Sequence, residues 1–169
     1  MSKILKKYEA SLLQGKNYTL QKRVIEKGTH YHPHWHDFFE FEIIIDGSGE
    51  HIYNNFQYMI EPGDAYLMSY RDFHALFAEN DITLMSLQFN GNVLTDEISS
   101  FLSMSYNRFR CRFNQAETEE ILGYLHTIDT ETREKKIYSD IVIKNAIVSV
   151  IIKTIRKSNC TECGFMPSL

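Results

Sequence analysis

Seven short runs of β-branched and aromatic residues follow one another between residues 21 and 89. They read QKRVIE, FEFEIII, EHIY, FQYMI, DAYLMS, HALFA and ITLMSLQF. The segments between them, which include DGSG, NN, EPGD, SYRD and END, are rich in residues that adopt turn conformations. Short strands joined by tight turns are typical of antiparallel sandwiches and barrels. The sequence therefore predicts a mainly β fold for residues 1–113, with an N-terminal arm before the first strand.

The hydrophobic pattern becomes helical near residue 114. Asn114 followed by Glu117 resembles a capping box and predicts a helix that runs towards Thr127. TETREKK is then expected to form a charged connector, and Ser139 to cap a second helix, DIVIKNAIVSVIIKTIRKS. The chain is thus interpreted as a barrel (1–113), a two-helix dimerisation segment (114–158) and a linker remnant (159–169).

The second helix is apolar on more than one face, so it needs more than one partner. Its apolar stripe at helical spacing includes Ile143, Ile147, Val150, Ile151 and Ile155. One partner is expected to be the barrel or the first helix, and the other a second copy of the chain, because 169 residues leave little mass to cover both faces. The sequence therefore predicts a homodimer through this stripe. The alternative is a helix that is fully buried in a monomer.

Charge, hydropathy and cysteine content argue against several classes of protein. The formal net charge is −4 and the pI is near 6.0, so the chain by itself lacks the clustered cationic surface that nucleic-acid binding needs. No apolar run approaches the roughly 20 residues of a membrane span, and the start MSKILKKYEA lacks the apolar core of a signal peptide. Three cysteines are too few for a disulfide framework, so we expect a cytoplasmic protein. Cys160-x-x-Cys163 is interpreted as a pair of linker thiols.

The stretch HYHPHWHDFFEFEIIIDGSG, residues 30–49, has histidines and glutamates at alternate positions. Because side chains alternate across a strand, these polar residues share one face if the strand is regular. They include His34, His36, Glu40 and Glu42. Imidazoles two positions apart can lean onto one metal ion at about 2.0–2.2 Å. Phe38 and Ile44 lie on the same face, and this mixture suits the lining of a barrel interior. His30 and His32 are expected at the surface in an entry loop before the motif, with a ligand contact as the alternative.

The spacing of these residues matches the first motif of the cupin family. That motif combines Gly28, the pair His34-x-His36, Glu40 and Gly47. The second cupin motif is partly present, since Pro62-Gly63-Asp64 begins it and His74 stands eleven residues after Gly63. Ser69, Arg71 and Ala78 depart from the residues that this motif usually has. Over about residues 20–90 the chain resembles a cupin, which implies a double-stranded β-barrel of jelly-roll type with a cavity.

A narrower resemblance covers both the barrel and the two helices. HPHWHDFFEFEIIIDGSGEHIYNNFQYMIEPGDAYLMSYRDFHALF is similar to the N-terminal sensor domain of AraC-type transcriptional regulators, with its G-x-G turn, PGD turn and D-x-H sequence. In that family two helices after the barrel mediate dimerisation, and a C-terminal domain with two helix-turn-helix units binds DNA. The sequence ends at Leu169, so DNA contact is expected only through a domain missing from this chain. CTECGFMPSL is interpreted as a cut linker.

The resemblance implies a small-molecule sensing domain whose effector, a sugar or another small polar metabolite, binds in the barrel. The predicted ligand-binding residues are His34, His36, Glu40 and His74, with Tyr53, Tyr58, Tyr66 and Met68 as further candidates. The first four also match the three-histidine, one-carboxylate ligand set of metal-binding cupins. A metal-dependent cupin enzyme, such as an isomerase, epimerase or dioxygenase, is therefore the alternative function. The prediction is a sensor without catalytic residues, for which no cofactor is expected, and a divalent metal ion at those four residues is the competing hypothesis.

Overall fold

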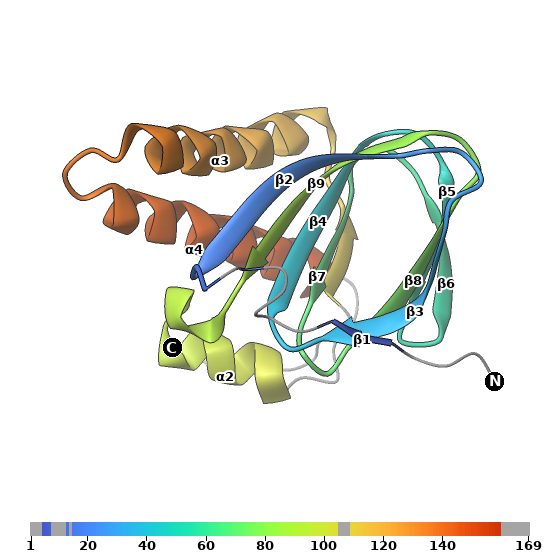
Figure 1. The fold of residues 1–169 in the computed structure, drawn as a ribbon, viewed down its shortest axis with the longest axis horizontal. Helices are drawn as coiled ribbons and strands as arrows, with labels where there is room; N and C mark the ends of the chain where they lie inside the picture. The colour runs from blue at the N-terminus through green and yellow to red at the C-terminus, as the bar shows by residue number, and fades with distance from the viewer. Residues whose placement is uncertain (1–4, 8–12, 14, 105–108, 160–169) are drawn as a thin grey trace.

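The computed structural model describes residues 5–7, 13, 15–104 and 109–159, which form three layers (Figure 1). A middle sheet is covered on one face by a second sheet and on the other by two long helices from the C-terminal third of the chain. No helix in these described ranges is long and apolar enough to cross a membrane. The Cys160-x-x-Cys163 motif, almost all of the expected linker and part of the N-terminal arm lie outside the described residues.

Strands dominate the chain up to residue 112. They are β1 (Leu5–Lys7), β2 (Tyr18–Ile25), β3 (His30–His36), β4 (Phe39–Asp46), β5 (Gly49–Tyr53), β6 (Phe56–Ile60), β7 (Asp64–Met68), β8 (Phe73–Ala78), β9 (Ile82–Phe89) and β10 (Phe109–Arg112). The helices are η1 (Gly91–Val93), α2 (Asp96–Met104), α3 (Gln115–Glu134) and α4 (Ser139–Asn159). All seven predicted runs lie on strands, which confirms a mainly β fold followed by two C-terminal helices.

The strands form two five-stranded sheets. The outer sheet has the order β1-β3-β8-β5-β6, and the middle sheet has the order β10-β7-β4-β9-β2. Strand β1 pairs in parallel with β3, and the other pairs are antiparallel. The predicted EPGD turn before β7 depends on Gly63, which has φ +88° and whose Cβ, if present, would lie 2.4 Å from the Phe113 carbonyl oxygen. This turn therefore brings the barrel and the start of the helical segment into direct contact.

The side chains of the middle sheet alternate between its two faces, as strand β4 illustrates. Phe39, Phe41 and Ile43 belong to a buried apolar cluster that they form with the helices. Glu40 and Glu42 lie on the opposite face and line a cavity shared with the outer sheet. One sheet thus carries a polar cavity on one side and the platform for the helices on the other.

Helix α3 begins as predicted and ends later than predicted. Asn114 Oδ1 accepts a hydrogen bond from the Glu117 amide at 3.0 Å, and Glu117 Oε2 accepts one from the Asn114 amide at 2.8 Å. The capping box is therefore confirmed. The expected connector TETREKK is mostly helical, since α3 continues to Glu134. The ion pair of Arg133 with Asp129 at 2.9 Å, one helical turn away, stabilises this last part of α3.

Helix α4 buries its predicted dimerisation residues inside a single chain. Ile143, Ile147, Val150 and Ile151 are buried, and Ile155 is partly buried, in the cluster between the middle sheet and the helices. This corrects the expectation that this stripe contacts a second copy, because the sheet and α3 already cover it. Dimerisation itself stays a prediction.

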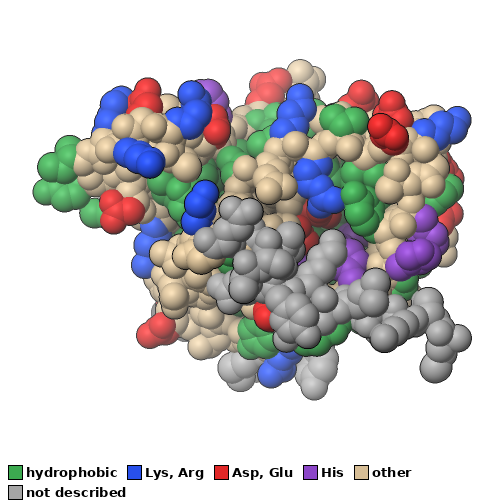
Figure 2. All heavy atoms as spheres, viewed as in Figure 1, with side chains coloured by type: hydrophobic (Ala, Val, Ile, Leu, Met, Phe, Trp, Pro, Cys, Tyr) green, Lys and Arg blue, Asp and Glu red, His purple; other side chains and the backbone are tan. Residues whose placement is uncertain are grey.

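The exposed apolar residues of the helical pair lie around its turn instead. The exposed fractions are 82% for Ile137, 65% for Tyr138, 54% for Ile141 and 38% for Val142. We call these four residues the turn patch. Figure 2 shows apolar side chains gathered at the end of the molecule where Figure 1 places the turn between α3 and α4. On α4 itself the exposed members of the turn patch are Ile141 and Val142.

The histidine-rich stretch forms two strands instead of one. Strand β3 ends at His36, and after Asp37 and Phe38 the strand β4 begins in the other sheet. The polar residues at even positions therefore do not share one face of a regular strand. His34 and His36 lie on the outer sheet and face Glu40 and Glu42 on the middle sheet. His30 and His32 are exposed, but they lie on β3. Strand β1, helices η1 and α2, and strand β10 were not predicted from the sequence.

Candidate functional site

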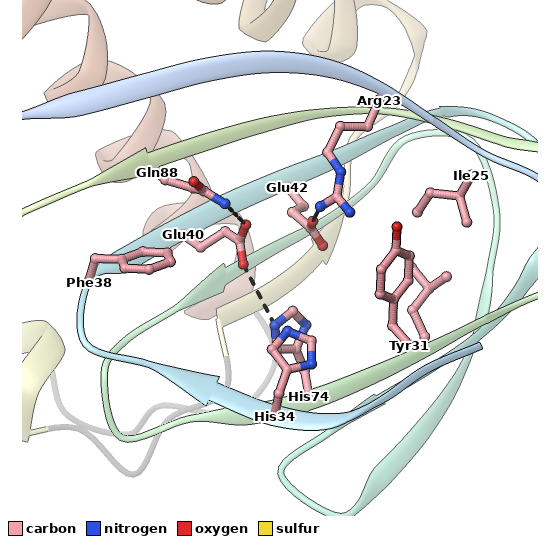
Figure 3. A pocket seen from close by; sticks show the side chains of 10 residues that line it. Arg23, Ile25, Tyr31, His34, Phe38, Glu40, Glu42, His74 and Gln88 are labelled. Carbon is pink, nitrogen blue, oxygen red and sulfur yellow. Dashed lines mark hydrogen bonds and ion pairs between the residues drawn. The ribbon is translucent and has the colours of Figure 1, made fainter. Parts of the chain in front are cut away.

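A small polar cavity lies between the two sheets, where β3 and β8 face β2, β4 and β9 (Figure 3). Its volume is about 20 Å³, which is room for about one water molecule or one ion. The described residues that line it are Arg23, Ile25, Tyr31, His34, Phe38, Glu40, Glu42, His74, Leu76 and Gln88. A cavity of this volume does not hold a sugar-sized molecule.

Glu40 is the centre of the polar network in this cavity. Its Oε1 accepts hydrogen bonds from Ser86 Oγ at 3.0 Å and from Gln88 Nε2 at 2.8 Å, both on β9. Its Oε2 lies 3.3 Å from Nε2 of His36 on β3 and 3.6 Å from Nε2 of His74 on β8. The middle sheet thus holds the carboxylate and presents it to two histidines of the outer sheet, and Figure 3 shows Glu40 between Gln88 and His74.

Backbone carbonyls determine which nitrogen is protonated in two of the histidines. Nδ1 of His36 lies 2.8 Å from the Phe38 oxygen, and Nδ1 of His34 lies 2.9 Å from the His32 oxygen. A carbonyl oxygen only accepts, so Nδ1 carries the proton in both rings. In the neutral ring Nε2 then presents a lone pair, which is the arrangement found in histidines that bind metal ions.

The charges of the network follow from burial and from Glu40. Burial alone lowers the pKa of His36, but the nearby charge of the Glu40 carboxylate outweighs it, so this pKa is raised above its ordinary value. Burial alone raises the pKa of Glu40, but His36 and His74 hold it well below its ordinary value. Burial lowers the pKa of His74 well below its ordinary value, and Glu40 offsets only part of this shift. At neutral pH Glu40 is therefore a carboxylate and His74 is neutral.

The donor atoms around Glu40 fit a divalent metal ion. The ligand atoms of His36, Glu40 and His74 all lie within 4.8 Å of one another. Nε2 of His36 and Nε2 of His74 are buried and have no hydrogen bond of acceptable geometry among the described residues. Two imidazole nitrogens and a carboxylate are a common donor set for zinc, manganese and related ions. A cation between them would satisfy both nitrogens and the buried negative charge.

His51 on β5 extends the network away from Glu40. Its Nε2 lies 3.1 Å from Nδ1 of His74, and both rings are buried. Burial lowers the pKa of His51 to about 3. Glu42, His51 and His74 form a second group whose ligand atoms lie within 4.8 Å of one another, so the two groups share His74.

Arg23 and Tyr31 close the cavity on its solvent side. Among the described lining residues these two are half-buried and the others are buried. Arg23 Nη1 lies 3.7 Å from Glu42 Oε1, and the Arg23 guanidinium carbon lies 5.3 Å from the centre of the Tyr31 ring. Figure 3 shows both side chains on the Glu42 side of the cavity. We call Arg23 and Tyr31 the lid.

The structure brings together part of the predicted site. His34, Glu40 and His74 line the cavity, and His36 contacts Glu40. His34 is not one of the residues whose ligand atoms converge within 4.8 Å. The other candidates lie elsewhere: Tyr53, Tyr66 and Met68 are buried in the apolar core between the sheets, and Tyr58 packs against that core. None of these four lines the cavity.

Sequence reasoning missed Arg23, His51 and Gln88 as site residues. Arg23 pairs across strands with Leu84, and Gln88 pairs with Glu40. The sequence shows whether each residue lies at an odd or an even position of its strand. It does not show how β2 and β4 pair with β9, and this pairing decides whether the odd or the even positions face the cavity.

Comparison with known proteins identifies the family. The family model of the AraC-like ligand-binding domain matches residues 23–134, which is more than half of the chain. The chain belongs to the AraC-like ligand-binding domain family. Strands β3 to β10 and helix α3 of this AraC-like domain lie in the matched region, whereas β1 and the start of β2 precede it. A search of curated proteins gives no match.

Several solved structures are similar to parts of the AraC-like domain. Ectoine synthase from P. lautus is 25% identical over 49% of this chain and 63% of its own, with a TM-score of 0.41. A salicylate 1,2-dioxygenase from Pseudaminobacter salicylatoxidans is 16% identical over 43% of this chain and 21% of its own, with a TM-score of 0.41. A conserved protein of unknown function from Streptococcus pyogenes is 18% identical over 53% of this chain and 89% of its own, with a TM-score of 0.42. The AraC-like domain spans about a fifth of the length of the salicylate dioxygenase.

Proposed function

We propose that this chain is the effector-sensing domain of an AraC-type transcription regulator, and that the effector binds in the cavity around Glu40. The observation that carries this proposal is a buried, charged cavity behind a lid, in a domain whose family binds ligands. A sugar or a similar polar metabolite suits the donors and acceptors of Arg23, Glu42 and Gln88. Because the closed cavity has room for only about one water, a metabolite would have to displace the lid.

Strand β2 connects the lid to the helical pair. Arg23 lies near one end of this strand, and Tyr18 begins it at the other end. The Tyr18 hydroxyl lies 2.6 Å from Thr132 Oγ1 near the end of α3. Displacement of Arg23 by an effector would therefore act on a strand that also contacts α3. This contact is a physical route from the cavity to the helices, whose equilibrium between two positions the effector would bias.

Thermal unfolding with a ligand panel tests the sensor proposal. Wild-type protein, Arg23→Met and Glu40→Gln would be melted with monosaccharides, sugar acids and polyols. A ligand at a hundredfold excess over its Kd is expected to stabilise the wild type by about 2.7 kcal/mol. The two variants should lose most of this shift. Equal shifts in all three proteins would place the ligand elsewhere. The regulator assignment is tested by the reading frame after the Leu169 codon, where a helix-turn-helix pair is expected.

A metal centre, and with it a metal-dependent enzyme, is the second candidate. The observation that favours it is the pair of buried Nε2 atoms of His36 and His74 beside Glu40. These three residues would hold a divalent ion, which acts as a Lewis acid on a bound oxygen atom when present. Metal analysis after dialysis tests the centre: about one equivalent is expected in the wild type and little in His36→Ala. Metal without turnover of any substrate would favour a metal-dependent sensor over an enzyme.

A further inference from the structure

His74 differs from His34 and His36 in the group that faces its Nδ1 atom. The Nδ1 atoms of His34 and His36 each face a backbone carbonyl, which can only accept a proton. Nδ1 of His74 faces Nε2 of His51 at 3.1 Å instead. A ring nitrogen can either donate or accept, so the protonated nitrogen of His74 is not fixed by the backbone.

The sheet register holds this histidine pair together. On β5 and β8, His74 lies opposite Tyr53 and His51 lies opposite Leu76, so the two histidines are diagonal neighbours on one face. The exposed fractions of His51 and His74 are 1% and 5%. The His51 ring also packs edge-on against Tyr66, with ring centres 4.1 Å apart. Both rings are thus confined, and the hydrogen bond between them can change only by moving protons.

We propose that His51 is a positioning residue for His74, and that their hydrogen bond reverses direction when a cation binds beside Glu40. This inference rests on the metal-centre candidate of the proposed function. Without a cation, Nε2–H of His51 donates to Nδ1 of His74, and Nε2–H of His74 points to Oε2 of Glu40, 3.6 Å away. With a cation, Nδ1–H of His74 donates to Nε2 of His51, and the Nε2 lone pair of His74 faces the cation.

The reversal conserves charge on the histidine pair. Nε2 of His74 releases one proton to solvent, and the proton of the hydrogen bond passes from His51 to His74. Nδ1 of His51 takes up one proton from solvent, so the net proton exchange is zero and both rings stay neutral. Nδ1 of His51 is buried and has no hydrogen-bond partner among the described residues. An unpaired buried N–H is rarer in proteins than an unpaired acceptor, so the cation-free state favours a bare Nδ1.

Three variants separate this role from simple packing. The amide of His51→Gln can both donate and accept, whereas His51→Leu can do neither. Tyr53→Phe is the matched control, because it removes a buried hydroxyl from a ring 6.3 Å from the His51 ring and leaves the histidines intact. With zinc as the probe, we expect Kd values close to wild type for His51→Gln and Tyr53→Phe. The Kd of His51→Leu should be about 10–100-fold weaker. Equal weakening in folded His51→Gln and His51→Leu would overturn the proposal.

Nitrogen NMR of the histidine rings gives a readout that needs no variant. In cation-free wild-type protein we expect a through-bond coupling between Nε2 of His51 and Nδ1 of His74, with His74 protonated on Nε2. Zinc should move the His74 proton to Nδ1. Absence of the coupling, or a His74 proton on Nδ1 before zinc is added, would overturn the proposal. If the wild type binds no zinc, the metal centre and the reversal both fail. The coupling then decides separately whether His51 holds His74.

Discussion

Glu40 and His36 lie four residues apart in the chain but on opposite sheets, and Oε2 of Glu40 is 3.3 Å from Nε2 of His36. Only Asp37, Phe38 and Phe39 separate the two residues. The Phe38 carbonyl accepts the hydrogen bond that fixes the His36 ring. The crossing between the sheets therefore also sets the orientation of a site residue, and the pair needs no long-range contact to form.

The pKa of His36 depends on the charge of Glu40. We expect Glu40→Gln to lower the pKa of His36, because burial then acts without the carboxylate that outweighs it. Glu42→Gln is the matched control, since the charge of Glu42 contributes less to this pKa. An NMR titration of the imidazole checks both variants. A larger change in Glu42→Gln than in Glu40→Gln would contradict the arrangement described above.

Acid should destabilise the fold through its buried histidines. Burial lowers the pKa of His51 to about 3 and also lowers that of His74, whereas both have ordinary values near 6.5 in the unfolded chain. Below that value the unfolded state binds more protons than the folded state. The free energy of unfolding should therefore fall with decreasing pH, by up to about 1.4 kcal/mol per pH unit for each histidine.

Two groups modify this pH dependence. His36, with its raised pKa, acts in the opposite sense. Its contribution to the free energy of unfolding is fully present below the pKa of the unfolded state, and it is lost as the pH rises through the pKa of the folded state. Glu40, with its lowered pKa, loses its contribution to the free energy of unfolding only at more acidic pH. Urea unfolding between about pH 7 and pH 5 checks the prediction. His51→Gln should show a shallower decline than the wild type, and an unchanged slope would mean that His51 does not stay neutral in the folded protein.

The lid arginine should contribute to stability through Glu42. Glu42 is buried, and Arg23 is its cationic neighbour at 3.7 Å. We expect Arg23→Met to reduce the free energy of unfolding by about 1–2 kcal/mol, a moderate value because the Arg23 side chain is 27% exposed. Adding Glu42→Gln should recover part of this loss, with a coupling energy of about 0.5–1 kcal/mol. Strictly additive losses in a double-mutant cycle would show that the two side chains do not interact.

Two substitutions on α4 distinguish folding from self-association. Val150 is fully buried, so Val150→Glu places a charge in the core and is expected to unfold the protein or to lower its melting temperature strongly. Ile141 is 54% exposed in the turn patch, so Ile141→Glu should leave the fold intact. If the turn patch forms a dimer, Ile141→Glu should convert it to a monomer in light scattering. A wild-type protein that is monomeric in light scattering at all concentrations tested would contradict the dimer prediction.

Local signals in the sequence were sufficient for most of the strands and for the start of α3. Turn residues such as Pro62 and Gly63 act within a few positions, and the Asn114 capping box is local as well. The later end of α3 comes with a local ion pair between Arg133 and Asp129, which the charged composition of TETREKK did not reveal, whereas the role of the α4 stripe depended on tertiary packing. The residues from Ile143 to Ile155 had the periodicity of either a buried or a shared face, and only the position of the middle sheet decided between them.

The residues of the cavity were predictable only in part, because some of them are brought together by strand pairing and not by local sequence. The cupin spacing located His34, His36, Glu40 and His74 from residues close in sequence or in a known motif. Gln88 and Arg23 reach the same cavity, and Ser86 reaches Glu40, through the pairing of β9 with β4 and β2, which no short pattern encodes. The four aromatic and methionine candidates were chosen without that pairing, and they lie in the core between the sheets or against it.

The alternation along β4 also limits how this domain can evolve. Insertion of one residue within β4 would exchange the faces of Glu40 and Phe41, which would put carboxylates under the helices and phenylalanines into the cavity. The lining of the cavity can therefore change by substitution at even positions of β4, but not by changes in strand length. Insertions and deletions among descendants of this sequence should instead occur in connections such as the Asn54-Asn55 turn, where they would not change which residues lie on either face of the middle sheet.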